Sequence, residues 1–480
     1  MSATTTLSDA KRKLLEKLSK GIGSQSRVQA EQIAKRPSGV PTSLASSQEQ
    51  VLNREDSVPQ IPPLYNESVT IYRYGPLDIV ALEKSFTEVI RRHEIWRSTY
   101  DFVDGARAHI VHPAPERIPL PLVDLRSLPK AERLAEMTRR VTEMARQPFD
   151  MKQGPLVRAI LVRLEELEHR LCLIVHQSIL DGISVYHVLL SELASLYEAF
   201  AAQKPSPLPE LPIQFGDYAY WQRDWLATGV LEQQAAFWKK ALREQVPPLA
   251  WPNRNPRPPM QSFRGAIEPF NCSEEFTRPV RSLSQQMGST LFVTLLTAFL
   301  VLLHGYTRQT HITIGTVSPA GRKRSETQKL MGYFLNPVPL RLYLTGEETF
   351  FSLVQRTQEV ISAAIGHDDI PFEFIVRELQ PEPDPSRNPF FTVAASLEPP
   401  LADVGPQWSL TPMDVECGGA RWDVYFVWDD RPTGMIGRVQ YNPDLFERSE
   451  IVSMVRDFMG LLERIIRDTN QKISEYVRRP

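Results

Sequence analysis

Cysteine is scarce in this chain: three residues, Cys172, Cys272 and Cys417, are spread over 480 positions. Their wide spacing fits neither the framework of a small disulfide-rich domain nor the clustered ligands of a zinc site. Cys172 also stands inside an apolar run that predicts a buried strand. These features favour a reducing compartment, so we expect a cytoplasmic protein.

Long apolar runs and an excess of charge of either sign are lacking as well. The longest apolar stretch, residues 291–303, is interrupted by Thr294 and Thr297 and is too short to cross a bilayer, so it predicts a buried helix. The first residues lack the apolar core of a signal peptide. Lys and Arg number 55 against 57 Asp and Glu, which gives no electrostatic footprint for nucleic acid. We therefore expect neither a membrane nor a nucleic-acid partner.

Motifs that hold nucleotides or metals are also missing. Gly21-Ile22-Gly23 has no preceding strand and no third glycine, so it does not make a phosphate-binding loop. Histidine and cysteine form no cluster with ligand spacing. We expect no intrinsically bound metal or cofactor.

What the chain does contain is centred on residues 171–182. The run Leu-Cys-Leu-Ile-Val at residues 171–175 predicts a strand buried on both faces, and residues 155–164 predict its hairpin partner. A polar cluster beginning at His176 ends the strand, and a helical pattern opens at Ser184. A single histidine after a strand is usually structural, and Asp-Gly is usually a turn, so this stretch alone defines no chemistry.

The remaining pattern predicts a mixed α/β chain in three parts. Residues 1–41 predict a short amphipathic helix and a flexible linker, and both a docking role for residues 1–25 and a solvated tail stay open. Residues 42–224 form the first lobe, which carries the polar cluster, and residues 225–480 form the second. Proline-rich connectors lie at residues 203–212 and 247–259.

Hydrophobic periodicity predicts the elements of both lobes. In the first lobe we expect helices at residues 78–92 and 130–146, strands at 68–74, 95–102 and 108–111, and an aromatic-rich helix opening at 215. In the second lobe we expect helices at residues 290–304, 350–365 and 450–468 and strands at 311–317, 391–397, 422–428 and 437–441.

Seven motifs in chain order resemble those of the condensation domains of nonribosomal peptide synthetases. The family's His-His-x-x-x-Asp-Gly motif reads His176-Gln177-Ser178-Ile179-Leu180-Asp181-Gly182 here. The other six lie at residues 45–52, 92–98, 215–221, 331–336, 367–373 and 386–389. Each motif is weak alone, but all seven occur in the family's order. The resemblance covers about residues 42–470.

The resemblance implies an α/β fold with two chloramphenicol-acetyltransferase-like lobes in a V-shaped pseudo-dimer around a central tunnel. Donor and acceptor carrier proteins would insert phosphopantetheine arms from the two faces. A carrier-bound acyl or peptidyl thioester and a carrier-bound amine would then form an amide bond at the histidine motif. The chain has no adenylation motif, no carrier serine motif and no Gly-x-Ser-x-Gly elbow, so we expect it to act with other proteins.

The same resemblance implies a catalytic set of His176, Gln177, Asp181 and Gly182. His176 and Asp181 would mainly hold the loop, and we expect Asp181 to pair with a buried Arg322 from the opposite lobe. The backbone N–H of Gly182 would lie where an oxyanion develops. Gln177 replaces the family's second histidine, to which the catalytic role is usually assigned.

Ser318, Arg322 and Asn336 stand in motifs that line the family's tunnel, so we expect them to bind substrate. The sequence does not fix the direction of the Ser318 and Asn336 side chains. For Arg322, an exposed position in the basic run 322–324 stays an open alternative.

The Gln177 departure removes a proton acceptor, because a glutamine amide has no useful basicity. General acid–base help is worth about 10²–10⁴-fold in rate. Positioning two tethered reactants can contribute about 7–11 kcal/mol, which is more, and an α-amine with a reference pKa near ~8 is partly neutral at pH 7. A slow condensation enzyme is therefore our first hypothesis. Acyl transfer to a free amine or alcohol and a non-catalytic carrier-docking protein are the alternatives.

Overall fold

The computed structural model describes residues 32–38, 40, 42–58, 62–244, 246–251 and 255–477. They divide between two compact units, Met1–Ala34 and Lys35–Pro480, and every element described below belongs to the second. The predicted N-terminal helix and the docking segment at residues 1–25 lie outside the described residues. The lobe boundaries at residues 41 and 224 stay a prediction.

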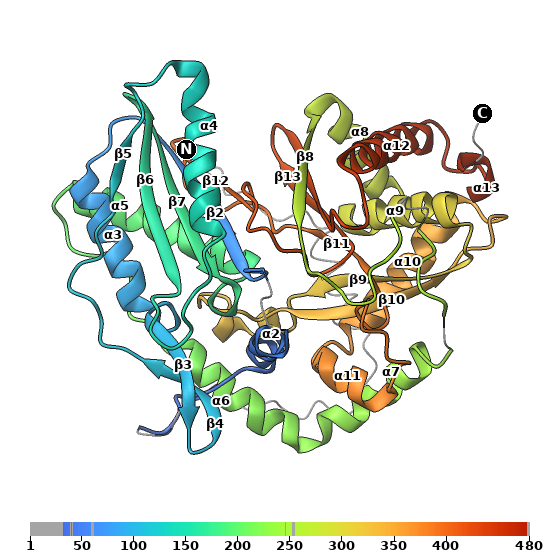
Figure 1. Ribbon diagram of the computed structural model, residues 1–480, viewed down its shortest axis with the longest axis horizontal. Coiled ribbons are helices and arrows are strands. Elements are labelled where there is room, and N and C mark those ends of the chain that lie inside the picture. Colours follow the sequence, from blue (N-terminus) through green and yellow to red (C-terminus); the bar gives the residue numbers. More distant parts are fainter. Residues whose placement is uncertain are drawn as a thin grey trace, which may run out of the picture. The chain divides into compact units, whose positions relative to one another are not determined.

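Four strands from the first half of the chain (residues 42–225) and one from the second half (residues 226–477) form a five-stranded sheet with the strand order β12-β2-β7-β6-β5 (Figure 1). Its strands are β2 (Asn66–Tyr74), β5 (Leu122–Asp124), β6 (Val157–Glu165), β7 (Glu168–His176) and β12 (Trp408–Pro412). The predicted hairpin is confirmed as β6 and β7, which pair antiparallel. Strand β12 comes from far along the chain and pairs antiparallel with β2. The second half therefore completes the sheet of the first.

Strand β7 is buried on both faces, as its apolar run predicts. Cys172 and Ile174 share a core with Met137 and Val141 of helix α4 (Lys130–Ala145), which lies over this sheet in Figure 1. Leu173, on the alternate face, is also fully buried. The strand that leads into the polar cluster is thus held from both sides.

A small sheet of β1 (Thr42–Ser43), β4 (Ala106–Val111) and β3 (Ser98–Val103) stands beside the large one. The prediction that a strand starts at residue 95 is wrong, because Glu94–Arg97 form the 3-10 turn η1 and β3 starts at Ser98. The reason lies in Trp96, which is buried and donates its indole N–H to the carbonyl oxygen of Ile179 at 3.2 Å. This contact ties the turn to the polar loop after β7.

The second half builds a six-stranded sheet with the order β10-β9-β11-β13-β14-β8. Its strands are β8 (Ala266–Ser273), β9 (His311–Ser318), β10 (Asn336–Tyr343), β11 (Val393–Leu397), β13 (Val424–Arg431) and β14 (Gly434–Tyr441). Phe426 of β13 packs on Phe299 of the buried helix α9 (Leu291–Thr307). Tyr425 therefore points to the opposite face, away from the helices.

Helices complete both halves (Figure 1). In the first half they are α2 (Ser46–Ser57), α3 (Ile79–Arg92), α4, α5 (Leu190–Ala201) and α6 (Phe215–Trp225), with the 3-10 turns η1 and η2 (Gln177–Ile179). The π-helix η3 (Ser184–Leu189) continues the helical residues 182–183 into α5. In the second they are α7 (Leu231–Ala241), α8 (Glu274–Gln286), α9, α10 (Phe350–Ile365), α11 (Phe372–Leu379), α12 (Arg448–Arg467) and α13 (Ile473–Tyr476), with the π-helical segment η4 (Leu226–Val230) and the 3-10 turns η5 (Ala320–Lys323) and η6 (Ser325–Thr327).

The predicted α/β class is confirmed, and apart from the start of β3 the predicted elements end within about three residues of the observed ones. Among the described residues, no single helix is long and apolar enough to cross a membrane; α8 and α9 pass such a test only as a pair, bent by 103°. All three cysteines are buried and unpaired.

Candidate active site

The loop after β7 is fixed by three parts of the chain. The backbone N–H of Gln177 donates to the Tyr65 carbonyl oxygen at 2.8 Å. The side chain of Gln48 on α2 donates to the Ser178 carbonyl oxygen at 2.8 Å, and Trp96 holds the next carbonyl group. Asp181 then caps the following helix by accepting the backbone N–H of Ser184 at 2.7 Å. The loop is rigid because most of its polar backbone is already bonded.

His176 is buried, with 1% of its surface exposed. Its Nδ1 lies 2.7 Å from the hydroxyl oxygen of Ser178 and its Nε2 lies 3.1 Å from Oε1 of Glu55. The rings of Tyr65 and Phe149 meet it edge-on. Both ring nitrogens are therefore committed to protein partners, which agrees with the loop-holding role expected for this histidine.

The predicted ion pair between Asp181 and Arg322 is present and buried. Arg322 Nε and Nη2 donate to the two carboxylate oxygens of Asp181 at 3.0 and 2.7 Å. The remaining donors go to the hydroxyl oxygen of Ser184 and to the carbonyl oxygens of Thr327 and Leu330. The alternative of an exposed Arg322 is wrong, since the residue is 4% exposed.

The loop opens onto a cavity with about 940 Å³ of empty space, including the part open to solvent. Gln177, Asp181 and Gly182 line it from the motif. Its other walls come from β2 and β12 of the first sheet and from β9, β11 and β13 of the second. Both sheets therefore contribute to the surface around the motif.

Gln177 is held by a residue from the second half of the chain. Nη1 of Arg421 donates to Gln177 Oε1 at 3.0 Å, and the Arg421 guanidinium lies over the rings of Trp422 and Tyr425. Its Nη2 lies 3.9 Å from Oε1 of Glu67. Because the amide oxygen faces Arg421, the amide nitrogen of Gln177 is the group left to donate to a substrate.

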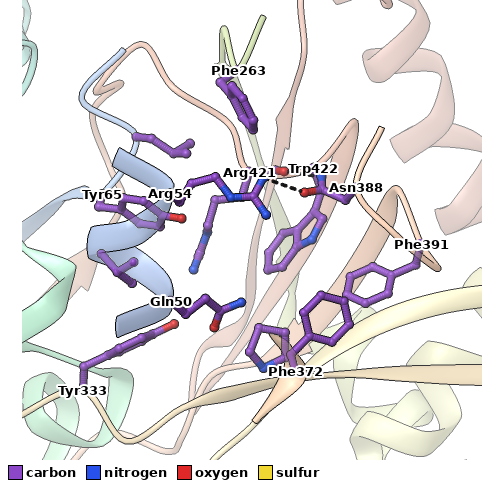
Figure 2. A pocket seen from close by; sticks show the side chains of 13 residues that line it. Gln50, Arg54, Tyr65, Phe263, Tyr333, Phe372, Asn388, Phe391, Arg421 and Trp422 are labelled. Carbon is purple, nitrogen blue, oxygen red and sulfur yellow. Dashed lines mark hydrogen bonds between the residues drawn. The ribbon is translucent and has the colours of Figure 1, made fainter. Parts of the chain in front are cut away.

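Arg421 also lines a second cavity with about 480 Å³ of empty space, including the part open to solvent, which Figure 2 shows from close by. Six of its 13 lining residues are aromatic: Tyr65, Phe263, Tyr333, Phe372, Phe391 and Trp422. Arg54 of α2 reaches Asn388 from the opposite side, with Nη1 3.2 Å from Asn388 Oδ1. The two cavities thus adjoin at Arg421.

Ser318 and Asn336 form a separate buried cluster around Asp368. The Ser318 hydroxyl donates to the Asp368 carboxylate, and burial raises the pKa of that carboxyl group. Asn336 Nδ2 donates to the carbonyl oxygens of Asp368 and Ile370 at 2.8 and 2.7 Å. Its Oδ1 accepts the backbone N–H of Phe372 at 3.1 Å. Neither side chain is among the residues that line the two cavities.

Among the residues of the first cavity that sequence reasoning missed are Arg421 and Glu398. Glu398 directly follows β11, and its Oε1 accepts a hydrogen bond from Arg438 Nη2 at 2.8 Å. Burial raises the pKa of Glu398 to about 7, against the opposing effect of Arg438. A carboxylate at the end of an apolar strand was the only available signal in the sequence.

Comparisons with known proteins agree with the motif resemblance. A family model described as "Condensation domain" matches residues 43–478. A linear gramicidin synthase protein of Brevibacillus parabrevis is 38% identical over 404 residues, covering 83% of this chain and 8% of that protein. Chondramide synthase cmdD of Chondromyces crocatus is 37% identical over 413 residues, covering 86% and 10%. The chain spans about a tenth or less of the length of these relatives.

Solved structures share the fold. The first condensation domain of the calcium-dependent antibiotic synthetase matches with a TM-score of 0.81 at 18% identity, covering 91% of this chain and 99% of that one. The X-domain from teicoplanin biosynthesis matches with a TM-score of 0.77 at 25% identity, covering 92% and 99%.

Proposed function

This chain belongs to the condensation-domain family, and we propose that it joins a carrier-bound acyl or peptidyl thioester to a carrier-bound amine in nonribosomal peptide or hybrid polyketide–peptide biosynthesis. The observation that carries the proposal is the rigid loop of residues 176–182, which opens into a cavity built by both sheets. The proposal includes a cytoplasmic location, which the three buried, unpaired cysteines support.

In this proposal the loop positions the reactants and stabilises developing charge. The helix after Asp181 begins at Gly182, so its first backbone N–H groups form the positive end of the helix dipole. The oxyanion formed when the amine attacks the thioester would be stabilised by the Gly182 N–H and by the amide nitrogen of Gln177. His176, Asp181 and Arg322 act as positioning residues, since their polar atoms are already bonded within the protein.

Gly182 lies in close contact with Glu398 and Pro399, so a side chain at this position would crowd the cavity beside the motif. A Cβ atom at this position would lie 3.1 Å from Glu398 Oε2 and 3.4 Å from Pro399 Cδ. A larger residue there would narrow the cavity beside the motif. Ser318 and Asn336 would support the site by holding residues 367–371 against β9 and β10.

The experiment is a reconstitution with two separate carrier proteins. One carries an acyl or aminoacyl thioester and the other an amine on phosphopantetheine, and mass spectrometry detects an amide-linked product on the acceptor carrier. We expect product with the wild type and at least about a 100-fold slower reaction with Gly182→Val, because the substitution blocks the positioning that the loop provides. Gly460→Ala on α12, where an added methyl group meets nothing within 4 Å, is the matched glycine control.

The two alternatives give different results. Product from a free amine or alcohol, without an acceptor carrier, would support acyl transfer to a free acceptor. Carrier binding without product from any tested pair would support the non-catalytic docking role.

A further inference from the structure

Glu398 brings a carboxylate to the same stretch of cavity wall as the motif loop. Its backbone N–H donates to the Trp428 carbonyl oxygen at 2.7 Å, which fixes the residue just beyond β11. Its Oε1 is bonded to Arg438. Its Oε2 lies 3.1 Å from the position that a Cβ on Gly182 would occupy. One oxygen is therefore anchored and the other faces the backbone of the motif.

The position of Glu398 bears on catalysis because residue 177 is a glutamine rather than a histidine. Gln177 and Glu398 line one cavity but come from different sheets, the first from the loop after β7 and the second from the end of β11. The glutamine amide cannot accept a proton from an attacking amine. Glu398 is a carboxylate in the same cavity, and it can accept that proton.

We propose that Glu398 is the proton acceptor of the condensation reaction in this chain, in the role that Gln177 cannot fill. The inference rests on the proposed function. The amine nitrogen forms a bond to the thioester carbonyl carbon, and the oxyanion collapses with cleavage of the carbon–sulfur bond. The proton lost by the nitrogen passes to Glu398 Oε2 and from there to the departing thiolate, so no oxidant or other reactant is needed.

The charged groups around Glu398 allow it both to take the proton from the amine and to give it to the thiolate. Arg438 on β14 and Arg431 on β13 favour the ionised form of Glu398, whereas Asp429 on β13 and Glu67 on β2 oppose it. Tyr186, from the helix after the motif, donates its hydroxyl hydrogen to Asp429. Burial outweighs the arginines and raises the pKa of Glu398 to about 7. A group with that pKa is partly ionised at neutral pH and can return the proton it takes.

A purely structural pair between Glu398 and Arg438 is the competing explanation, so the test must separate chemistry from stability. Glu398→Gln keeps the shape and an oxygen for Arg438 but cannot accept a proton, and Glu398→Asp keeps the carboxylate on a shorter arm. Glu268→Gln is the matched control. Glu268 is a buried glutamate on β8, in the same sheet as Arg438, it is bonded to Arg448 of α12, and it lines neither cavity.

With carrier-bound donor and acceptor, we expect Glu398→Gln to slow amide formation by about 10- to 10³-fold, within the usual range for general-base loss. The wild-type rate should show an inflection near pH 7 from Glu398 in addition to the one that the acceptor amine gives near ~8, and the Gln variant should keep only the amine inflection. Glu398→Asp should retain more activity than the Gln variant, and Glu268→Gln should match the wild type. Thermal unfolding of each variant reports whether the fold is intact.

A second-site rescue makes the test specific. In the Glu398→Gln background, Gln177→His supplies an imidazole to the same cavity and should restore at least about 10-fold in rate. Product formation by Glu398→Gln at the wild-type rate and with the wild-type pH profile would overturn the inference while leaving the proposed function standing. No product from the wild type with any donor and acceptor would overturn both.

Discussion

In the motif loop, the Asp181 carboxylate is a charged group with no exposure to water. Its side chain is fully buried and accepts from Arg322, Ser184 and the backbone N–H of Phe334. Because Arg322 is equally buried, the cost of desolvating both charges is offset only while both are present. The pair therefore matters for the fold as much as for the site.

Asp181→Ala should lower the free energy of unfolding by about 3–5 kcal/mol, since it leaves the Arg322 guanidinium buried without a counter-charge. Urea denaturation measures this. Glu166→Ala is the control, because Glu166 is 71% exposed in its pairs with Arg126 and Arg163 and should cost no more than about 1 kcal/mol. Equal stability of Asp181→Ala and wild type would show that the pair is dispensable.

His109 is a buried histidine whose protonation should make the stability of the protein depend on pH, and it contacts a residue that holds the motif loop. It is 3% exposed, its Nε2 lies 2.7 Å from Gln48 Oε1, and its ring stacks on Phe215. Gln48 in turn holds the Ser178 carbonyl group. Burial lowers the pKa of His109 to about 3, and the positive charge of Arg36 adds to the effect.

The unfolded chain protonates this histidine near its reference pKa of about 6.5, whereas the native state does so only near 3. The unfolded state therefore binds more protons, and stability falls as pH falls below about 6.5, by up to about 1.4 kcal/mol per pH unit. We expect His109→Gln to flatten the pH dependence of unfolding free energy between about pH 6.5 and 4.5, measured by urea titration. An unchanged slope would place the acid-sensitive group elsewhere.

At the scale of elements, the hairpin and the loop were predictable because local sequence determines them. A buried strand has a continuous apolar run, and the polar cluster after it marks its end. The 3-10 turn at η1 was not predictable from periodicity, since Trp96 is turned inward by a bond to Ile179, which is remote in sequence. The sequence alone did not show toward which face of the sheet the Ser318 and Asn336 side chains point. The pairing of β9 with β10, in which Ser318 lies opposite Asn336, shows it.

Asn336 is an inward-facing residue that anchors the segment leading into helix α11. Its three hydrogen bonds fix residues 368–372, which lead into α11. Asn336→Ala should destabilise the protein by about 3 kcal/mol, at about 1 kcal/mol for each bond. Hydrogen exchange should show faster exchange of the Phe372 amide first. Loss of stability without a local change at α11 would argue against this anchoring role.

At the scale of the whole second unit, the candidate site depends on contacts between the two halves. Glu398, Arg421 and Arg322 reach the motif from the second half. Arg322 was predicted only through the family resemblance, and no local pattern names Glu398 or Arg421 as a partner of the motif. The alternation of buried and partly exposed residues in Trp408–Pro412 fits a strand. Its pairing with β2 nevertheless depends on the complete fold.

Strand β12 makes the halves interdependent, and this leads to a test of the predicted boundary at residue 224. Without β12, β2 presents an unpaired edge, which favours association with other chains. We expect residues 42–224 expressed alone to form oligomers or aggregates, because Asp181 also lacks Arg322. Co-expression with residues 225–477 should give a one-to-one complex by size-exclusion chromatography with light scattering.

The matched control is the same co-expression with Leu410→Asp in the second half. Leu410 is fully buried in β12, opposite Ile71 of β2, so a charge there removes apolar contact and leaves an unpaired carboxylate in the sheet. This variant should weaken the complex and return the first half to the associated state. A monomeric 42–224 fragment that unfolds cooperatively on its own would contradict the expectation, because it would show that the first sheet is complete without the strand from the second half.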